Sequence, residues 1–257
     1  MLFSDFLTSP TPDYDTHSAM NTASSTYLGR KLHGQVVNEL GRRIVSGHYP
    51  AGQILPKEEE LGLELKVSRT ALRESVKVLA AKGLLESRPR IGTRVRDKQE
   101  WNLLDPDILL WSCTAGIDMD FLRHLNELRA MIEPGAVSLA ASSRTEAQLQ
   151  DISDALSRMR NSKKISQWVE ADLEFHTAIL KATNNPLLMP LAAIIGSALS
   201  SLLNVSARSA TDFKLGLPDH EKVFTAIKNG DAQGGQLHMA SLLSATRTLI
   251  RSVEKLT

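Results

Sequence analysis

The chain has 257 residues, of which 42 % are hydrophobic and 23 % are charged, a globular composition long enough for two domains. Its net charge of +1 favours no particular partner, but the charge is unevenly distributed. Residues 28–98 carry 15 Lys and Arg against 8 Asp and Glu, a net charge of +7, whereas residues 1–27 and 99–257 each carry −3. A basic segment of this kind is typical of a surface that displaces counterions from phosphates.

Cysteine content and hydropathy indicate the compartment. The single cysteine, Cys113, excludes an intramolecular disulfide and fits a reducing environment. No basic-then-apolar signal begins the sequence, and the longest weakly polar run, residues 191–205, is too short to span a bilayer. We therefore expect a cytoplasmic protein that makes no membrane contact.

The first hundred residues divide into a tail and a small domain. Residues 1–27 are rich in Ser, Thr, Asp and Pro without periodicity, which predicts a flexible tail. From Leu28, apolar residues recur every three to four positions, so we expect a helix that ends at Gly47. A second helix is expected from Pro56 to about Lys66, because three acidic residues follow the proline.

The next segment completes a winged helix-turn-helix pattern over residues 28–98. Ser68 is a suitable N-cap for a third helix over residues 69–82, which Gly83 ends. The short segments 84–87 and 93–96 predict two strands joined by a basic turn.

From Trp101 onward the pattern is helical to the end of the sequence. It predicts an all-α antiparallel bundle over residues 99–257. The expected helices cover about residues 106–113, 119–141, 145–160, 165–183, 186–208, 218–229 and 231–254.

The third helix carries the candidate DNA contacts. In a helix-turn-helix the second helix enters the major groove with its N-terminal residues on the base edges. Here those residues are Ser68, Arg69, Thr70, Ala71 and Arg73. Arg can bind guanine in bidentate fashion or clamp a phosphate. The hairpin adds cations that could follow the backbone or enter the minor groove: Arg88, Arg90, Arg94 and Arg96. An Arg-rich helix can also be only a solvated surface, but the order turn, recognition helix and basic wing favours a DNA reader.

The run LPKEEELGLELKVSRTALRESVKVLAAKGLLESRPRIGTRV resembles the winged helix-turn-helix of the GntR family of bacterial transcription regulators. The resemblance covers about residues 28–96 and implies DNA contacts by Arg69, Thr70 and Arg73 and by the wing, through Arg90, Gly92 and Thr93. Two departures bear on operator preference. Family members often have an Arg in the helix that here reads Glu58-Glu59-Glu60, and Gly is common at the position of Arg90.

The helical region contains a candidate metal site. Asp172 and His176 are four residues apart on one expected helix, so their side chains point the same way. His220 begins a later helix, and His238 lies in the last one. A carboxylate and two or three imidazoles that converge in a bundle can bind Zn²⁺ or a similar divalent ion, although any single His is more often an ordinary core or surface residue.

The segments VEADLEFHTAILKATNNPLL and DHEKVFTAIKNGD resemble the FCD ligand-binding domain of the FadR branch of the same family. In that branch an Asp, the His four residues on and two later His often hold a metal, which implies Asp172, His176 and His220 as ligands. The last family His usually falls where this chain has Leu242, so His238 fits poorly. A three-residue site completed by water or by the effector is the alternative.

Arg129 lies on a helix that otherwise presents apolar residues, and a buried cation needs a partner. Two interpretations stay open: an internal ion pair with Glu133, or a clamp for the carboxylate of a small acid. The candidate effector residues are Arg129, Asp172, His176 and His220. The stretches EWNLLDPDILLW, EADLEFH and NNPLL also resemble the members of this branch that regulate galactonate operons, which implies a sugar acid, D-galactonate first, as effector.

Together these observations predict a homodimeric transcription regulator, a repressor that a sugar acid releases from a pseudo-palindromic operator. The alternatives are the same architecture sensing another aldonate, a hexuronate or lactate, or acting as an activator. A metal-dependent hydrolase fused to a DNA-binding module is disfavoured, because Glu174 lies on another helix face and no HExxH-type element occurs. We therefore expect no enzymatic activity.

Overall fold

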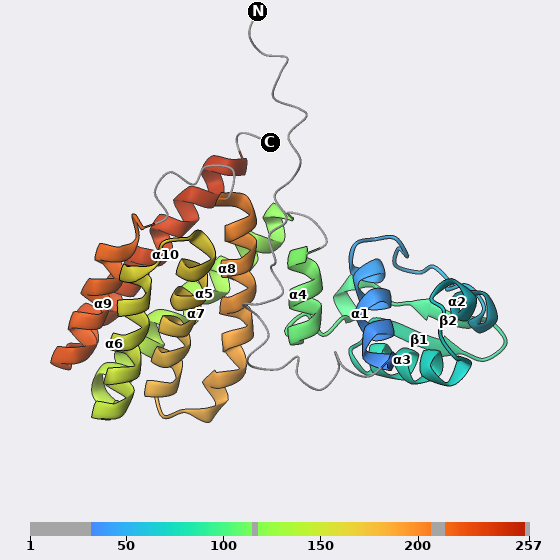
Figure 1. Ribbon diagram of the computed structural model, residues 1–257, viewed down its shortest axis with the longest axis horizontal. Coiled ribbons are helices and arrows are strands. Elements are labelled where there is room, and N and C mark those ends of the chain that lie inside the picture. Colours follow the sequence, from blue (N-terminus) through green and yellow to red (C-terminus); the bar gives the residue numbers. More distant parts are fainter. Residues whose placement is uncertain (1–31, 115–117, 207–213, 255–257) are drawn as a thin grey trace, which may run out of the picture.

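The computed structural model describes residues 32–114, 118–206 and 214–254. The predicted tail, residues 1–27, and the predicted helix start at Leu28 lie outside the described residues. Figure 1 shows a winged unit on one side, a helical bundle on the other and the helix α4 (Pro106–Thr114) between them. The mainly α fold predicted from the sequence is confirmed.

The winged unit packs helices against a small antiparallel sheet. Its elements are α1 (Leu32–Val45), α2 (Glu58–Glu64), α3 (Arg69–Ala81), β1 (Leu85–Arg88) and β2 (Gly92–Val95). Leu40 and Ile44 of α1, Leu61 of α2, and Leu72 and Leu79 of α3 belong to one buried cluster. Their three- and four-residue spacing turns one apolar face of each helix to this core, which holds the recognition helix in place.

Local backbone chemistry fixes how α3 begins. Lys66 has a φ of 56°, a left-handed conformation that ends the preceding helix. The Ser68 hydroxyl then accepts a hydrogen bond from the backbone N–H of Ala71 at 3.2 Å, so Ser68 is the N-cap that the sequence predicts.

The two strands pair Leu85 with Val95 and Arg88 with Gly92. The strand boundaries predicted from the sequence are wrong by one residue: β1 lies one residue later than predicted, and β2 lies one residue earlier. Leu84 is not part of β1, because its N–H donates to the carbonyl of Leu79 at the end of α3. Gly92, with a φ of 115°, is included because glycine tolerates this backbone as the chain leaves the turn.

The long apolar helix predicted for residues 186–208 is wrong. The chain instead forms a 3₁₀ segment, η2 (Pro186–Leu191), followed by α8 (Ala192–Ser206). Pro190 within η2 has no N–H to donate to a helical ladder, which accounts for the break. The remaining helices agree with the prediction within one or two residues. A short 3₁₀ turn, η1 (Lys98–Glu100), follows the second strand.

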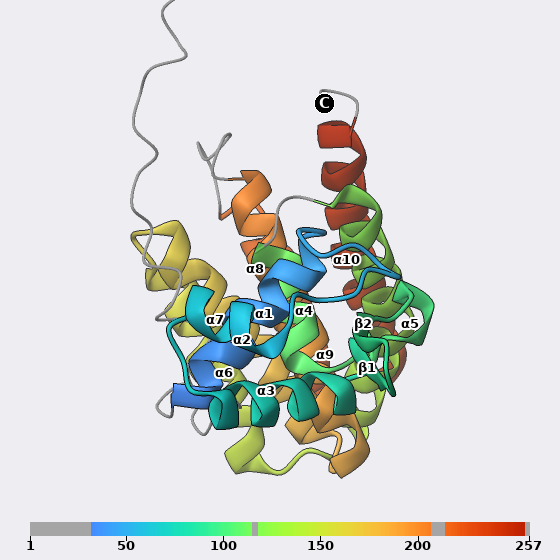
Figure 2. The same ribbon diagram turned by 90° about the vertical axis from the view of Figure 1, so that its right-hand side faces the viewer.

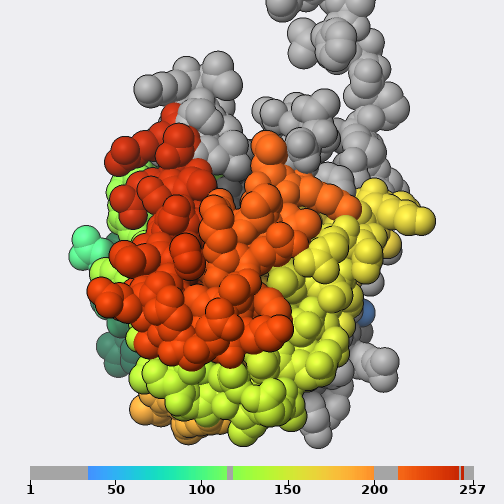
Figure 3. Space-filling view, turned by 90° about the vertical axis from the view of Figure 1, so that its left-hand side faces the viewer, coloured from blue at the N-terminus to red at the C-terminus, as the bar shows by residue number. Residues whose placement is uncertain are grey.

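The bundle is formed by α5 (Met119–Ser143), α6 (Glu146–Asn161), α7 (Ile165–Ala182), α8, α9 (Leu217–Asn229) and α10 (Ala232–Glu254). Figure 3 shows the face of the bundle that is turned away from the winged unit, with α9 and α10 in orange and red. The core contains Val137 and Ala140 from α5, Phe175 from α7 and Val223 from α9. These residues bring α5, α7 and α9 together, and the candidate effector residues lie on the same three helices.

The helix α4 (Pro106–Thr114) joins the two cores. Its Ile108 and Trp111 lie in the core of the winged unit, whereas its Leu109 and Cys113 pack with α5 and α8. The Trp111 ring N–H donates to Asn38 Oδ1 of α1 at 3.0 Å. A Cβ added at Gly41 of α1 would lie 2.4 Å from the Trp111 ring, so glycine is what permits this approach. The winged unit is thus packed directly against the helix that leads into the bundle.

Within the described residues, no helix combines the length and the apolar character that crossing a membrane requires.

Candidate functional site

The candidate recognition helix is exposed along the residues that the sequence predicts for DNA contact. Ser68, Arg69, Thr70 and Arg73 are all exposed at the start of α3. In Figure 2, α2 and α3 lie on the side of the winged unit that faces the viewer. Arg69 and Arg73 are one helical turn apart, so both guanidinium groups leave the same face of α3.

Both arginines are paired with acidic residues of α2, which the sequence analysis did not anticipate. Arg69 Nη2 lies 2.6 Å from Glu59 Oε1, and Arg73 Nε lies 2.8 Å from Glu58 Oε2. These carboxylates belong to the segment Glu58-Glu59-Glu60, where the resemblance to the GntR family implies a basic contact with DNA. The chain therefore has anions where a phosphate contact is expected, and these anions hold the cations of the recognition helix.

The hairpin cations are unequally available. Glu86 accepts hydrogen bonds from Arg88 Nε at 3.0 Å and from Arg94 Nε at 2.6 Å, and Arg96 pairs with Glu100 at 2.6 Å. Arg90 is exposed at the turn with a φ of 67°, and it makes no ion pair with the described part of the chain. The left-handed φ agrees with the sequence observation that Gly is common at this position.

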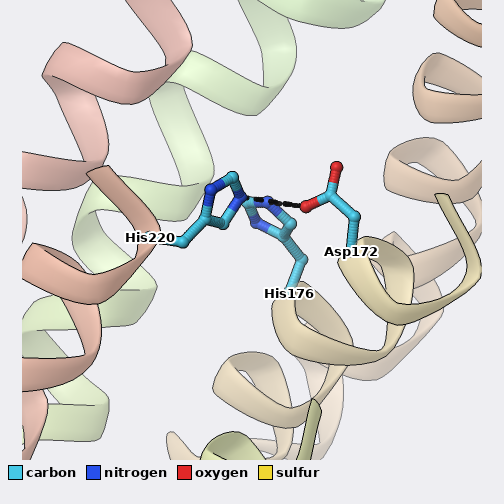
Figure 4. A group of neighbouring side chains, drawn as sticks. All are labelled: Asp172, His176 and His220. Atoms are coloured by element: carbon cyan, nitrogen blue, oxygen red, sulfur yellow. Dashed lines mark hydrogen bonds and ion pairs between the residues drawn. The ribbon is translucent and has the colours of Figure 1, made fainter. Parts of the chain in front are cut away.

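The metal-site candidates Asp172 and His176 of α7 and His220 of α9 come together inside the bundle. His176 Nε2 lies 3.2 Å and His220 Nε2 lies 3.0 Å from the same oxygen, Asp172 Oδ1. Figure 4 shows both imidazole rings turned towards this carboxylate. The three residues are 2–7 % exposed.

Arg129 and Glu133 of α5 complete a buried network around His176. Arg129 Nε donates to Glu133 Oε1 at 2.6 Å, so the internal ion pair that the sequence left open is present. Glu133 Oε2 also pairs with His176 Nδ1. Arg129 Nη2 lies 3.5 Å from His176 Nε2, which places the guanidinium at the edge of the Asp-His-His cluster. From the sequence, Glu133 is predictable only as a partner of Arg129 at i, i+4, because its contact with His176 depends on the packing of α5 against α7.

Neighbouring charges shift the pKa values of three buried groups in this network. Burial alone would raise the pKa of Glu133, but Arg129 and His176 outweigh burial and lower that pKa to about 2. Burial likewise favours neutral Asp172, yet His220 and His176 hold the pKa of Asp172 well below its usual range. Burial opposes protonation of His176, but Glu133 and Asp172 raise the pKa of His176 to about 9. The buried carboxylates therefore favour the protonated form of His176, and the neighbouring cations favour the charged forms of both carboxylates.

The donor set fits a divalent ion. One oxygen of Asp172 and one nitrogen from each of His176 and His220 all lie within 4.8 Å of one another. His220 Nδ1 lies 2.7 Å from the carbonyl of Gly216, and His176 Nδ1 faces Glu133. Nδ1 of each ring thus faces an oxygen atom, which leaves both Nε2 atoms directed to the common point, as outer-shell partners of metal-binding His do. An oxygen and two imidazole nitrogens suit Zn²⁺.

His238 does not join this cluster. It is half-buried and lines a separate surface hollow of about 460 Å³ together with Glu221 and Asp231. Leu242, where the family His usually falls, is a buried apolar residue. Among the described residues no further His, Cys, Asp or Glu completes the three-residue group.

Glu174 does not supply a general base for metal-dependent hydrolysis at the Asp-His-His cluster. Its carboxylate pairs with Arg158 at 2.6 Å on the surface of the bundle, with a side chain that is 44 % exposed. This agrees with the expectation that Glu174 lies on a different helix face from Asp172 and His176.

Comparison with known proteins identifies both parts of the chain. Residues 32–95 match the bacterial regulatory proteins of the gntR family, and residues 124–245 match the FCD domain. The chain is 34 % identical over 229 residues to the uncharacterized HTH-type transcriptional regulator YieP of Escherichia coli, covering 88 % of this chain and 95 % of that protein. The chain belongs to the GntR family. It is a DNA-binding transcription regulator with an FCD domain, and its relatives are regulators rather than enzymes.

A named repressor is also among the relatives of this GntR regulator. The Escherichia coli galactonate operon transcriptional repressor is 32 % identical over 218 residues, which is 84 % of this chain and 95 % of that protein. The fold is shared with Lar of Listeria monocytogenes, with a TM-score of 0.63 and 18 % identity over 89 % of this chain and 99 % of that one.

Proposed function

We propose that this GntR regulator is a repressor released from its operator by a sugar acid, with D-galactonate as the first candidate. The observation that carries the proposal is the buried network in which Arg129 borders the Asp172, His176 and His220 cluster. A cation and a metal site side by side are complementary to an acid that bears a hydroxyl group next to its carboxylate. The relative named as the galactonate operon transcriptional repressor supports the choice of D-galactonate.

In this proposal Asp172, His176 and His220 hold Zn²⁺, which supplies positive charge for a carboxylate and a hydroxyl oxygen of the acid. Glu133 and the Gly216 carbonyl orient the two imidazoles. Arg129 uses Nε for Glu133, and its guanidinium has further N–H groups that can donate to the second carboxylate oxygen. The burial of this network excludes water and strengthens these charge interactions.

For operator binding, we propose that α3 of each winged unit lies in a major groove. The proposed contacts are Ser68, Arg69, Thr70 and Arg73, with the wing residues Arg88, Arg90, Gly92 and Thr93 at the backbone or minor groove. A homodimer would present two such units to a pseudo-palindromic operator. Light scattering coupled to size-exclusion chromatography tests the dimer, and a monomer at operator-binding concentrations would contradict it.

The route from effector to DNA is proposed to run through α4. This helix packs on α1 through Trp111 and on α8 through Leu109 and Cys113. Effector binding that shifts α5 or α8 would change this packing and with it the position of the winged units. The acid releases DNA only if it binds the non-operator arrangement more tightly.

A thermal-shift screen of sugar acids and other small carboxylates, with and without a chelator, tests the effector class and its metal dependence together. D-galactonate is expected to raise the melting temperature of metal-loaded protein and to release labelled operator selected from a random pool. Sugar acids without effect on either readout would refute the proposal. A response to lactate or a hexuronate instead would reassign the effector, and stronger DNA binding with the acid would indicate an activator.

Metal content identifies the ligands independently of effector binding. His176→Ala is expected to lose most of the zinc measured by mass spectrometry. His238→Ala is the matched control and is expected to retain it, because His238 lies in a separate hollow. Equal zinc in the two variants would contradict the proposed ligand set.

A further inference from the structure

Asn126 of α5 is a buried amide whose hydrogen-bonding capacity is unused. The residue is 2 % exposed. Neither its Oδ1 nor its Nδ2 has a hydrogen-bond partner in the described part of the chain. The amide offers two donors and a carbonyl acceptor, and leaving these groups buried without partners is costly. Buried polar groups in folded proteins are nearly always paired, so an unpaired amide indicates a missing partner.

The position of Asn126 connects it with the candidate effector site. Asn126, Arg129 and Glu133 are spaced at i, i+3 and i+7 on α5 and therefore share the buried face of this helix. Arg129 reaches within 3.5 Å of His176 Nε2, at the edge of the cluster. Asn126 lies one turn nearer the N-terminus of α5, a rise of about 4.5 Å along the helix axis.

We propose that Asn126 recognises a hydroxyl group on the carbon chain of the effector. This inference rests on the proposed function, in which the carboxylate of a sugar acid lies at Arg129 and the metal cluster. Because the bonds of a carbon chain zigzag, each advances the chain by less than its length of roughly 1.5 Å, so a rise of about 4.5 Å needs at least about three to four carbon–carbon bonds. The hydroxyl that Asn126 contacts is therefore on the fourth carbon or beyond, and a three-carbon acid such as lactate ends before it.

The chemistry of the amide suits such a ligand. A hydroxyl both donates and accepts a hydrogen bond, and the amide of Asn126 supplies the complementary oxygen and N–H₂ group within one side chain. A site that leaves a buried polar group unpaired discriminates strongly against an analogue that lacks the matching hydroxyl. Asn126 would then be the residue that makes the site selective for a long polyhydroxy acid over a short hydroxy acid.

Asn126→Leu tests this role, because leucine has a similar size and no polar atoms. An amide reserved for a ligand destabilises the free protein, so the variant is expected to melt at a higher temperature than the wild type without ligand. Its affinity for D-galactonate, measured by calorimetry on zinc-loaded protein, is expected to fall by about ten- to a hundredfold. Its affinity for glycolate, which has the carboxylate and neighbouring hydroxyl alone, is expected to stay within about twofold.

Asn38→Leu is the matched control. The Asn38 amide accepts a hydrogen bond from Trp111 at 3.0 Å, so the same substitution there removes a structural contact. It is expected to lower the melting temperature and to leave the preference for D-galactonate over glycolate unchanged.

The outcomes separate this inference from the proposed function. A lower melting temperature of Asn126→Leu, or an equal loss of affinity for both acids, would show that Asn126 has a structural role and would overturn the inference alone. Wild-type protein that retains zinc but binds neither acid would overturn the proposed function, and the role of Asn126 with it.

Discussion

The replacement Glu59→Gln is expected to tighten binding of the protein to duplex DNA. Arg69 Nη2 lies 2.6 Å from Glu59 Oε1, so this ion pair competes with any phosphate or base for the same guanidinium. The carboxylate also lies beside the candidate recognition helix, where it repels the phosphate backbone. Glutamine keeps the size and the hydrogen-bonding oxygen of the side chain but removes the charge.

The size of the effect follows from the exposure of the pair. The Arg69 and Glu59 side chains are 66 % and 70 % exposed, so water and salt screen their attraction. Exposed pairs of this kind contribute about 0.2–1 kcal/mol, and the release of Arg69 therefore corresponds to about 1.4- to 5-fold tighter binding. The effect is expected to be larger at low salt, where the charge is least screened.

Fluorescence anisotropy with a random-sequence duplex at about 50 and about 200 mM salt measures this change. Glu74→Gln is the matched control: Glu74 also lies on α3, but its carboxylate pairs with Lys77 at 2.8 Å. The control removes the same charge without freeing Arg69 from Glu59. If Glu59→Gln binds no more tightly than Glu74→Gln at either salt concentration, Glu59 does not restrain Arg69 and the reasoning is refuted.

Three further predictions test other parts of the structure. Arg69→Ala is expected to lose specific operator binding in a gel-shift assay while dimer mass and effector affinity stay unchanged; retained specific affinity would refute its role. Glu133→Ala is expected to lower the free energy of unfolding in urea, with chelator present, by about 3–5 kcal/mol, because Arg129 and His176 lose their buried partner. Exposed Glu174→Ala is the control, with an expected change below about 0.5 kcal/mol, and equal losses would contradict the network. Gly41→Ala is expected to destabilise the protein by about 1–3 kcal/mol through its clash with Trp111, and an unchanged urea midpoint would show that α4 moves freely.

The parts of the fold that depend on local chemistry could be predicted from the sequence. The Ser68 N-cap, the three- and four-residue apolar spacing and Gly83 define α3 almost to the residue, because neighbours in the chain satisfy the helix ends. The errors occurred where distant or irregular contacts decide the backbone. The N–H of Leu84 donates to the carbonyl of Leu79 at the end of α3, so the first strand begins one residue later than predicted. Pro190 interrupts a run whose apolar residues alone predict one continuous helix.

By itself, the sequence determined that Asp172 and His176 share one face of a helix, and that Arg69 and Arg73 share one face of another. Helical periodicity fixes such faces, but it does not determine which residue of another helix lies opposite. The packing of α5, α7 and α9 decided that Glu133 and His220 meet the α7 pair and that His238 does not. Packing of α2 against α3 likewise decided that Glu58 and Glu59 hold the recognition arginines. The physical reason is that burial and charge pairing are fixed only when helices far apart in the chain pack together. The same packing buries the amide of Asn126 without a partner, which the sequence alone does not reveal.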